Sequence, residues 1–231
     1  MISSELIHEA GETLRTVRDC LRFGETRLRA GEVFLGHGTD DPWDEALALL
    51  MKVLHLPVNA DPRILDARLL PSEVRDYLAL LVKRVNQKVP VPYLTGEAWF
   101  CGLPFFVDER VLIPRSPLAE LIEAGFQPWL APERVGRVLD LCTGSGCIAI
   151  SIASGLSSAQ LTATDISPAA LAVASTNATT HEVADRIVFL EGDLFEPLDS
   201  QARFDFIASN PPYVTTAQLD QLAPDIRDHE P

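Results

Sequence analysis

The residues VLDLCTGSG at positions 138–146, followed at once by the apolar run CIAI at 147–150, decide the fold. An apolar strand that ends in an acid and a glycine-rich turn before an apolar helix brings a ligand close to bare backbone. The glycines allow a tight chain path and leave room for the ligand, and the first amides of the helix can face a polar group. We therefore expect a small-molecule cofactor above Gly144 and Gly146.

The same turn is compatible with two kinds of cofactor. Gly144, Gly146 and Ala149 fit the G-x-G-x-x-A dinucleotide fingerprint, and Asp165 lies 19 residues beyond Gly146, where that fingerprint places a ribose-binding acid. Because a different ribose-bearing cofactor would need the same acid, the turn alone leaves the choice open. In both cases we expect Asp165 to bind ribose hydroxyl groups, although a solvated turn residue would look the same.

The pattern of strands and helices continues after this turn. Short apolar runs at 161–164, 187–190 and 204–208 are separated by helical stretches. Strands that alternate with helices predict an α/β fold with a parallel sheet wound by right-handed crossovers.

Two further motifs follow the third and fourth predicted strands. Glu191-Gly192-Asp193-Leu194 offers an acid that can accept a hydrogen bond from an adenine amino group, or that can simply cap a helix. The fourth strand runs into Ser209-Asn210-Pro211-Pro212-Tyr213, which could be a plain strand terminator. Ligands of open α/β sheets bind outside the carboxyl ends of the strands, so we expect this tetrad, 210–213, beside the glycine turn.

The tetrad suits the placement of a planar –NH₂ group. A carboxamide nitrogen is a poor nucleophile because its lone pair is delocalised into the carbonyl, so its methylation requires placement more than acid–base power. The Asn210 side-chain oxygen and the Pro211 carbonyl can accept its two N–H groups, Tyr213 can cover its flat face, and Pro211 and Pro212 stiffen the acceptors. Glutamine and adenine both carry such a group, so the motif predicts the type of acceptor and not the molecule.

The first half of the chain has a different character. Helical periodicity predicts helices over 3–22, over 42–54 with Asp41 as cap, and over 72–88. Prolines and aromatic residues then predict a β-hairpin with its turn at 101–104. We expect three regions: a helical substrate-recognition domain at 1–90, a β-hairpin linker at 91–117, and a cofactor-binding domain at 118–231.

Composition limits the function further. The net charge is −14, and every lysine lies before residue 111, whereas gripping a nucleic-acid backbone normally takes a basic surface. We expect no stable nucleic-acid binding and a basic protein partner. The four cysteines form no CxxC pair and no zinc-ligand cluster, and no apolar run approaches the length of a membrane span. We expect a cytoplasmic protein with reduced thiols and no metal.

These motifs resemble class I S-adenosylmethionine-dependent methyltransferases of the N5-glutamine type. The resemblance extends to PYLTGEAWFCG (92–102), VLIPRSP (111–117), FGET (23–26) and GHGTDD (36–41). The WFCG and PRSP versions are similar to the branch that methylates the third protein of the large ribosomal subunit. The release-factor branch usually has an acidic pair where Ser116 and Pro117 stand here.

The resemblance implies a Rossmann-like sheet, S-adenosylmethionine as cofactor and a set of site residues. The implied cofactor-binding residues are Asp140, Cys142, Thr143, Gly144, Ser145, Gly146, Asp165, Asp193, Leu194 and Asn210. The implied catalytic residues are Asn210, Pro211, Pro212 and Tyr213. Cys142 departs from the commoner glycine at the first position of the loop.

Three alternatives to this function stay open on the sequence alone. One is a glutamine methyltransferase for a peptide-chain release factor. The second is an adenine-N6 methyltransferase, which would flip a base into the same pocket. The third is a binding module that kept the fold and lost turnover. The resemblance implies a sheet of seven strands, and four can be counted before Pro231. We therefore expect the chain to be part of a longer polypeptide that supplies the missing C-terminal strands.

Overall fold

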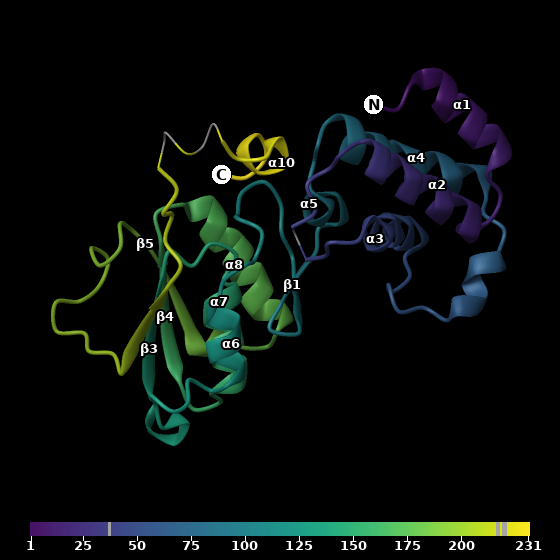
Figure 1. The fold of residues 1–231 in the computed structure, drawn as a ribbon. Helices are drawn as coiled ribbons and strands as arrows, with labels where there is room; N and C mark the ends of the chain where they lie inside the picture. Colours follow the sequence, from purple (N-terminus) through teal and green to yellow (C-terminus); the bar gives the residue numbers. More distant parts are fainter. Residues whose placement is uncertain (37, 216–217, 219–220) are drawn as a thin grey trace. The chain divides into compact units, whose positions relative to one another are not determined.

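The computed structural model describes residues 1–36, 38–215, 218 and 221–231, which form two compact units (Figure 1). The helical unit comprises Met1–Thr95 and Gln221–His229, and the sheet unit comprises Gly96–Asp220 and Glu230–Pro231. His37, within the GHGTDD motif, lies outside the described residues, as do residues 216–217 and 219–220.

The helical unit follows the predicted periodicity for two of its helices. Its elements are α1 (Ser4–Thr13), α2 (Val17–Ala30), α3 (Pro42–Leu54), the 3-10 turn η1 (Pro62–Asp66), α4 (Pro71–Asn86), α5 (Val91–Thr95) and α10 (Pro224–Arg227). The bounds predicted for α3 are confirmed, and the Asp41 side chain accepts the Trp43 amide at 3.0 Å as its cap. Helix α4 begins one residue before its predicted start and ends two residues before its predicted end.

The prediction of a single helix over 3–22 is wrong. Helix α1 ends at Thr13, and α2 begins after Thr16. The Thr16 hydroxyl accepts the Asp19 amide at 3.2 Å, and the Asp19 carboxylate accepts the Thr16 amide at 2.9 Å. This capping box satisfies amides that a continuous helix would bond internally, so the chain starts a new helix there.

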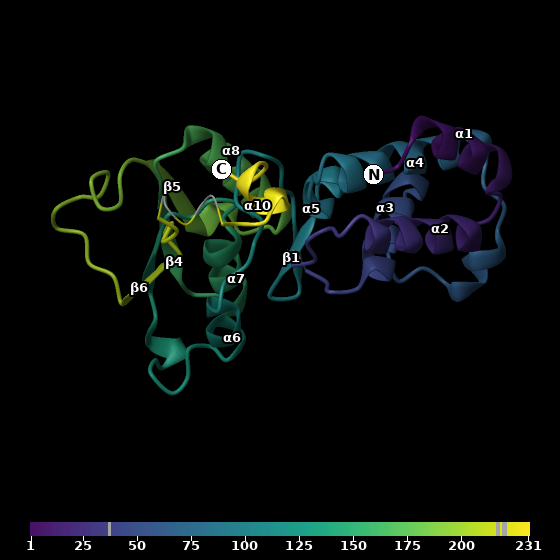
Figure 2. The ribbon, with the colours of Figure 1, turned by 45° about the horizontal axis from the view of Figure 1, so that its top comes forward.

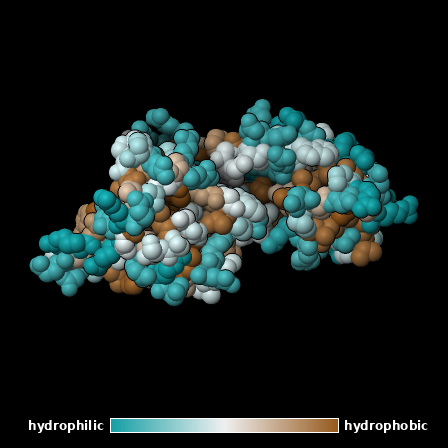
Figure 3. All heavy atoms as spheres, turned by 90° about the horizontal axis from the view of Figure 1, so that it is seen from below, coloured by the Kyte–Doolittle hydropathy of each residue, from teal (hydrophilic) through white to brown (hydrophobic). Residues whose placement is uncertain are grey.

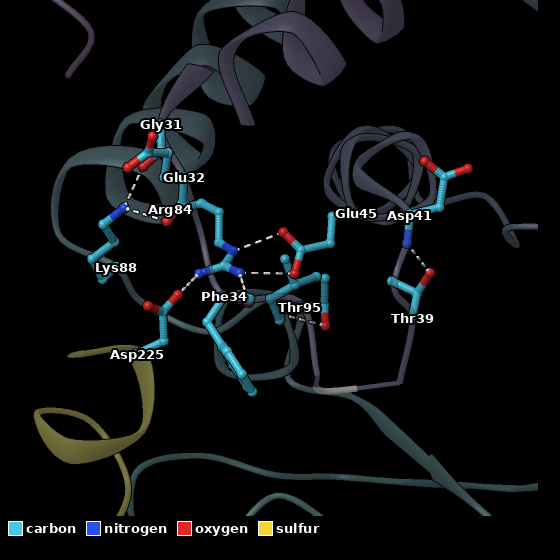
Figure 4. Close-up of polar contacts among 11 residues, drawn as sticks. Gly31, Glu32, Phe34, Thr39, Asp41, Glu45, Arg84, Lys88, Thr95 and Asp225 are labelled. Atoms are coloured by element: carbon cyan, nitrogen blue, oxygen red, sulfur yellow. Dashed lines mark hydrogen bonds and ion pairs between the residues drawn. The ribbon is translucent and has the colours of Figure 1, made fainter. Parts of the chain in front are cut away.

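A fully buried arginine lies in the helical unit (Figure 4). Arg84 donates from Nε and Nη2 to Glu45 at 2.8 and 2.9 Å, and from Nη2 to the Phe34 carbonyl at 2.7 Å. Its Nη1 donates to Asp225, which is buried as well. A buried cation is stable only when it is paired and hydrogen-bonded, so this arginine fixes residues 221–229 as part of the helical unit.

The sheet unit has the predicted parallel α/β fold. Its strands are β3 (Arg137–Leu141), β4 (Gln160–Asp165), β5 (Ile187–Glu191) and β6 (Phe206–Ser209), parallel and in the order β5-β4-β3-β6. Its helices are α6 (Leu118–Glu123), α7 (Cys147–Gly155) and α8 (Pro168–Thr180), with the 3-10 turns η2 (Pro132–Arg134) and η3 (Ala184–Arg186). Figures 1 and 2 show α7 and α8 packed side by side on one face of the sheet.

The two faces of the sheet are covered to different extents by the rest of the chain. Val188, Thr162, Leu139 and Ile207 share one row of the register, and the two outer members, Val188 and Ile207, are exposed. Within the described residues, β6 pairs with β3 alone and is an edge strand. Apolar side chains reach the surface elsewhere too, as brown atoms among hydrophilic ones in Figure 3.

The hairpin predicted in the linker is confirmed and belongs to the sheet unit, but its turn is shorter than the predicted 101–104 because Leu103 and Pro104 already pair within the second strand. Strands β1 (Ala98–Phe100) and β2 (Leu103–Phe105) pair antiparallel around Cys101 and Gly102, which both have positive φ. Beyond β2, the Phe106 amide donates to Asn177 Oδ1 at 2.8 Å, which fastens the hairpin to α8.

The compact units differ from the expected boundaries at 1–90, 91–117 and 118–231. Residues 91–95 and 221–229 group with the helical unit, whereas the rest of the linker groups with the sheet. The physical reasons are the Arg84–Asp225 pair on one side and the Asn177 hydrogen bonds on the other.

Membrane spans and metal clusters are both absent from the residues that the structure describes. No helix among them is long and apolar enough to cross a membrane. In the same ranges, no group of three or more His, Cys, Asp or Glu side chains could hold a metal ion. All four cysteines are free thiols.

We predict that Arg84→Leu lowers the free energy of unfolding by about 3–5 kcal/mol, because it leaves Glu45 and Asp225 buried without a cation. Urea denaturation followed by circular dichroism measures the change. The control is Arg63→Leu, which breaks an exposed pair with Asp61 and should leave the midpoint unchanged. Equal midpoints for Arg84→Leu and the wild type would contradict the prediction.

Candidate active site

The four parallel strands end together at one edge of the sheet. Leu141 pairs with both Thr164 and Ser209, and Asp165 pairs with Glu191. The loops at 142–146, 166–167, 192–194 and 210–213 therefore all leave the same edge, as the position of the motifs predicted.

The first loop needs glycine at positions 144 and 146 for different geometric reasons. Both have positive φ, +55° at Gly144 and +80° at Gly146, a region that costs other residues strain. A Cβ at Gly146 would meet the Ala174 Cβ and Ile150 Cδ1 atoms at 3.0 Å, so this glycine lets the loop pack on α8. A Cβ at Gly144 would meet no heavy atom of the described chain within 4 Å. Gly144 thus faces open space, which suits a ligand that lies against the backbone.

Cys142 lies in the left-handed region with φ of 58°. A side chain costs about 1–2 kcal/mol there, which is the physical reason why glycine is the easier residue at this position. Burial raises the pKa of its thiol, and the neighbouring charges of Asp165, Asp140 and Asp193 raise it further. The thiol therefore stays protonated beside three acids.

Asp165 fixes the glycine loop from the end of β4. Its Oδ2 accepts the Gly144 amide at 2.8 Å, and its Oδ1 accepts the Ser167 amide at 2.9 Å. Each carboxylate oxygen accepts more than one hydrogen bond, so both can also take a ribose hydroxyl. The Asp165 backbone carbonyl accepts the Gly192 amide at 3.0 Å, which brings the loop after β5 beside it.

Asp140 lies beneath the loop and is completely buried. Its Oδ2 accepts the Thr143 hydroxyl at 2.6 Å, while its Oδ1 is buried with no partner in the described chain. Burial raises the pKa of Asp140 to about 7, and the charge of Asp165 adds to this, while the hydrogen bond from Thr143 acts in the opposite direction. Thr143 and Ser145 are buried too, so direct contact of these three side chains with a cofactor stays a prediction.

The loop after β5 presents Asp193 and Leu194 to solvent. Leu194 has φ of 47°, and its carbonyl accepts the Thr164 hydroxyl at 3.1 Å. Ile166, directly after Asp165, is 70% exposed. Ile166 is not among the predicted site residues, although an aliphatic residue next to the predicted ribose acid was the available signal.

The Asn-Pro-Pro-Tyr motif leaves the end of β6. Ser209 donates its hydroxyl to the Leu141 carbonyl at 3.0 Å, which fixes the start of the motif against the strand that carries the glycine loop. Asn210 is half-buried and donates its Nδ2 to the Arg115 carbonyl at 3.5 Å. Pro211 and Pro212 are exposed, and Tyr213 is 78% exposed.

Asn177 is a second residue that the sequence analysis missed. It is buried in α8 and donates its Nδ2 to the Ser145 carbonyl at 2.9 Å and to the Phe106 carbonyl at 3.0 Å. One carboxamide thus ties the glycine loop to the hairpin. A polar asparagine within a helix of mostly small residues was the only local signal.

Comparisons with known proteins agree with this geometry. Residues 126–225 match the family model of the methyltransferase small domain. The chain is 47% identical over 221 residues to the ribosomal protein uL3 glutamine methyltransferase of Bordetella pertussis, covering 95% of this chain and 74% of that protein. It is 44% identical over 224 residues to the protein of the same name from Burkholderia pseudomallei, covering 94% and 73%.

Solved structures with partial similarity include an S-adenosylmethionine-dependent methyltransferase from Geobacter sulfurreducens in complex with S-adenosyl-L-homocysteine. It is 31% identical, with 41% of this chain and 36% of that chain covered and a TM-score of 0.34.

The parallel sheet, its glycine loop and the matching family model define the chain as a class I methyltransferase. At this identity over nearly its whole length, the chain belongs to the ribosomal protein uL3 glutamine methyltransferase family. The resemblance noted in the sequence is confirmed, including the choice of the ribosomal branch over the release-factor branch.

We predict that Asp140→Asn does not show the loss of stability that the wild type shows at neutral and basic pH. Because the pKa of Asp140 is raised from its ordinary value of 3.8 to about 7, the fold favours the neutral acid, and wild-type stability falls as pH rises from about 4 through 7. Asparagine is neutral throughout. Melting temperatures between pH 5 and 8 should show the variant gaining on the wild type as pH rises.

A contrast is available at Asp205, whose pKa is lowered by the hydrogen bonds that it accepts from the Arg137 and Gly136 amides. Its charged form is favoured by the fold, and the stability that this contributes is already complete above its ordinary pKa of 3.8, so the difference between Asp205→Asn and the wild type should stay constant from pH 5 to 8. Parallel curves for the wild type and Asp140→Asn would show that Asp140 does not titrate in this range.

Proposed function

We propose that this chain transfers the methyl group of S-adenosylmethionine to the side-chain nitrogen of a glutamine in ribosomal protein uL3. The observation that carries the proposal is the position of Asn210–Tyr213 at the end of β6, in register with the end of β3 that bears the glycine loop. The relatives named for this activity support the choice of substrate.

The residues at the sheet edge fit the cofactor. Asp165 is placed to accept the ribose hydroxyl groups while it orients Gly144. Ile166 follows Asp165 and Leu194 follows Asp193, and both aliphatic side chains are exposed, which suits contact with the faces of an adenine ring. Asp193 can accept a hydrogen bond from the adenine amino group. When bound there, S-adenosylmethionine supplies an electrophilic methyl group on a sulfonium.

The acceptor motif supplies placement. Asn210 Oδ1 and the Pro211 carbonyl accept the two N–H groups of the glutamine amide, and Tyr213 covers its flat face. With the cofactor bound, these residues would hold the amide nitrogen in line with the methyl carbon so that the new carbon–nitrogen bond replaces the carbon–sulfur bond, and one amide proton would then pass to water. Two fixed acceptors and a ring keep the nitrogen in a near-attack position, which is where the rate gain arises.

The net charge and the class of substrate support the expected partner, the expected lack of nucleic-acid binding and the expected location. A net charge of −14 suits a basic ribosomal protein, and the lack of lysines after residue 110 disfavours stable nucleic-acid binding. Because ribosomal proteins are made and assembled in the cytoplasm, we place the enzyme there. The helical unit is the part of the chain that we assign to substrate recognition.

The decisive experiment is transfer of a radiolabelled methyl group to purified uL3, to a release factor and to ribosomal RNA in parallel. Mass spectrometry of the labelled peptide identifies the residue. We expect label on one glutamine of uL3. Label on the release factor or on adenine instead would contradict the proposal.

We predict that Asp165→Ala weakens S-adenosylmethionine binding by about 1–3 kcal/mol, as expected when charged hydrogen bonds to a ligand are lost. Isothermal calorimetry measures it, with Asp185→Ala, an exposed acid on η3, as control. Unchanged affinity would reduce Asp165 to a turn residue. Tighter binding of NAD than of S-adenosylmethionine would overturn the cofactor assignment.

We predict that Asn210→Ala lowers turnover by about 10²-fold or more while cofactor affinity stays nearly unchanged, because placement is lost and the cofactor site is kept. Asn210→Asp keeps an acceptor oxygen but adds charge beside the sulfonium, so part of the activity should survive. Single-turnover methylation assays compare the variants. An undiminished rate for Asn210→Ala would leave the motif as a strand terminator.

A further inference from the structure

A bidentate ion pair fixes the side chain of Arg115, in the linker segment 111–117. Arg115 Nη1 donates to Glu230 Oε1 at 2.6 Å, and Nη2 donates to Glu230 Oε2. The Glu230 side chain is 2% exposed and that of Arg115 is 38% exposed. Two parallel charge-assisted hydrogen bonds to a buried carboxylate fix both position and orientation, unlike a single surface contact.

The backbone around Arg115 is restrained as well. Ile113 is buried, Pro114 has a locked φ, and the Ser116 hydroxyl accepts the Leu118 amide at 3.2 Å at the start of α6. The Arg115 carbonyl therefore has a defined position. That carbonyl accepts a long hydrogen bond of 3.5 Å from the Nδ2 of Asn210.

This contact distinguishes the two ends of the Asn210 carboxamide. The oxygen and nitrogen of an asparagine have nearly the same shape but opposite hydrogen-bonding character. If the nitrogen faced the substrate, it would meet the N–H groups of the glutamine amide, donor against donor. The Arg115 carbonyl can pair only with the nitrogen of Asn210, and so turns the oxygen toward the substrate.

We propose that Arg115 and Glu230 are positioning residues, which hold the Arg115 carbonyl so that Asn210 presents its oxygen to the acceptor amide. This inference rests on the proposed function of Asn210. In this proposal the effect on the substrate passes through the Arg115 carbonyl and not through either side chain.

The same linker offers a matched control. Arg110 also makes a bidentate contact, with Asp108 two residues away, from Nε at 2.8 and 3.0 Å. That pair is local, whereas Arg115 and Glu230 lie 115 residues apart in sequence. A general effect of losing an arginine–carboxylate pair in the linker would appear in both.

The kinetic test compares Glu230→Gln and Arg115→Lys with Arg110→Lys in uL3 methylation. We expect kcat to fall about 10-fold or more in the first two variants, on the scale on which misplacement is felt. The KM for uL3 and the Kd for S-adenosylmethionine should stay within about twofold, since neither binding surface is altered, and Arg110→Lys should match the wild type. An unchanged kcat in Glu230→Gln would overturn the inference, and so would an equal loss in Arg110→Lys.

A double-mutant cycle with Asn210→Asp separates positioning from general support. Aspartate has two equivalent oxygens and no wrong orientation, so adding Glu230→Gln to Asn210→Asp should cost little further activity. Full additivity of the two changes would show that Glu230 does not act through the Asn210 amide, and would overturn the inference.

A readout without turnover separates this inference from the proposed function. The Asn210 side-chain NH₂ signals in a ¹H–¹⁵N spectrum are identified by their loss in Asn210→Asp. They should shift in Glu230→Gln and stay in place in Arg110→Lys. Unshifted signals in Glu230→Gln overturn the positioning role whatever the enzyme methylates. If the signals shift in Glu230→Gln but the wild type does not methylate uL3, the positioning role is supported and the proposed function is rejected.

Discussion

The parallel pairing of β3 with β4 and β6 is the constraint on which the site depends. Leu141 lies opposite Thr164 on one side and Ser209 on the other, so the glycine loop, Asp165 and Asn210 leave the sheet at one level. Side chains alternate along a strand, so a shift of one residue would turn each of them to the opposite face.

Hydrogen bonds from single side chains to backbone then position each loop. Asp165 accepts the Gly144 amide, Asn177 donates to the Ser145 carbonyl, and Asn210 donates to the Arg115 carbonyl. An amide nucleophile needs placement, and placement needs loops that do not relax when the substrate arrives. The chemistry that the family performs is thus consistent with a site rich in fixed backbone contacts, in which the titratable Asp140 is buried beneath the loop.

Two buried carboxylates that follow the acceptor motif each pair with an arginine. Within the helical unit, Asp225 pairs with the buried Arg84, and within the sheet unit, Glu230 pairs with Arg115. Leaving either carboxylate buried without its cation would be costly, so each pair fixes its acid within its own unit.

The sequence by itself determined the features that depend on local periodicity and turn chemistry. The glycine loop, the alternation of strands and helices, the helix behind Asp41 and the turn at Cys101 could be read from a few neighbouring residues, as could the candidate acids and the Asn-Pro-Pro-Tyr motif. The break before Thr16 was also local, through its capping box, and was missed. Only the tertiary structure decided the roles of Arg84, Asn177 and Arg115. Their partners lie 141, 71 and 115 residues away, and a buried, paired charge looks the same in a sequence as a solvated one.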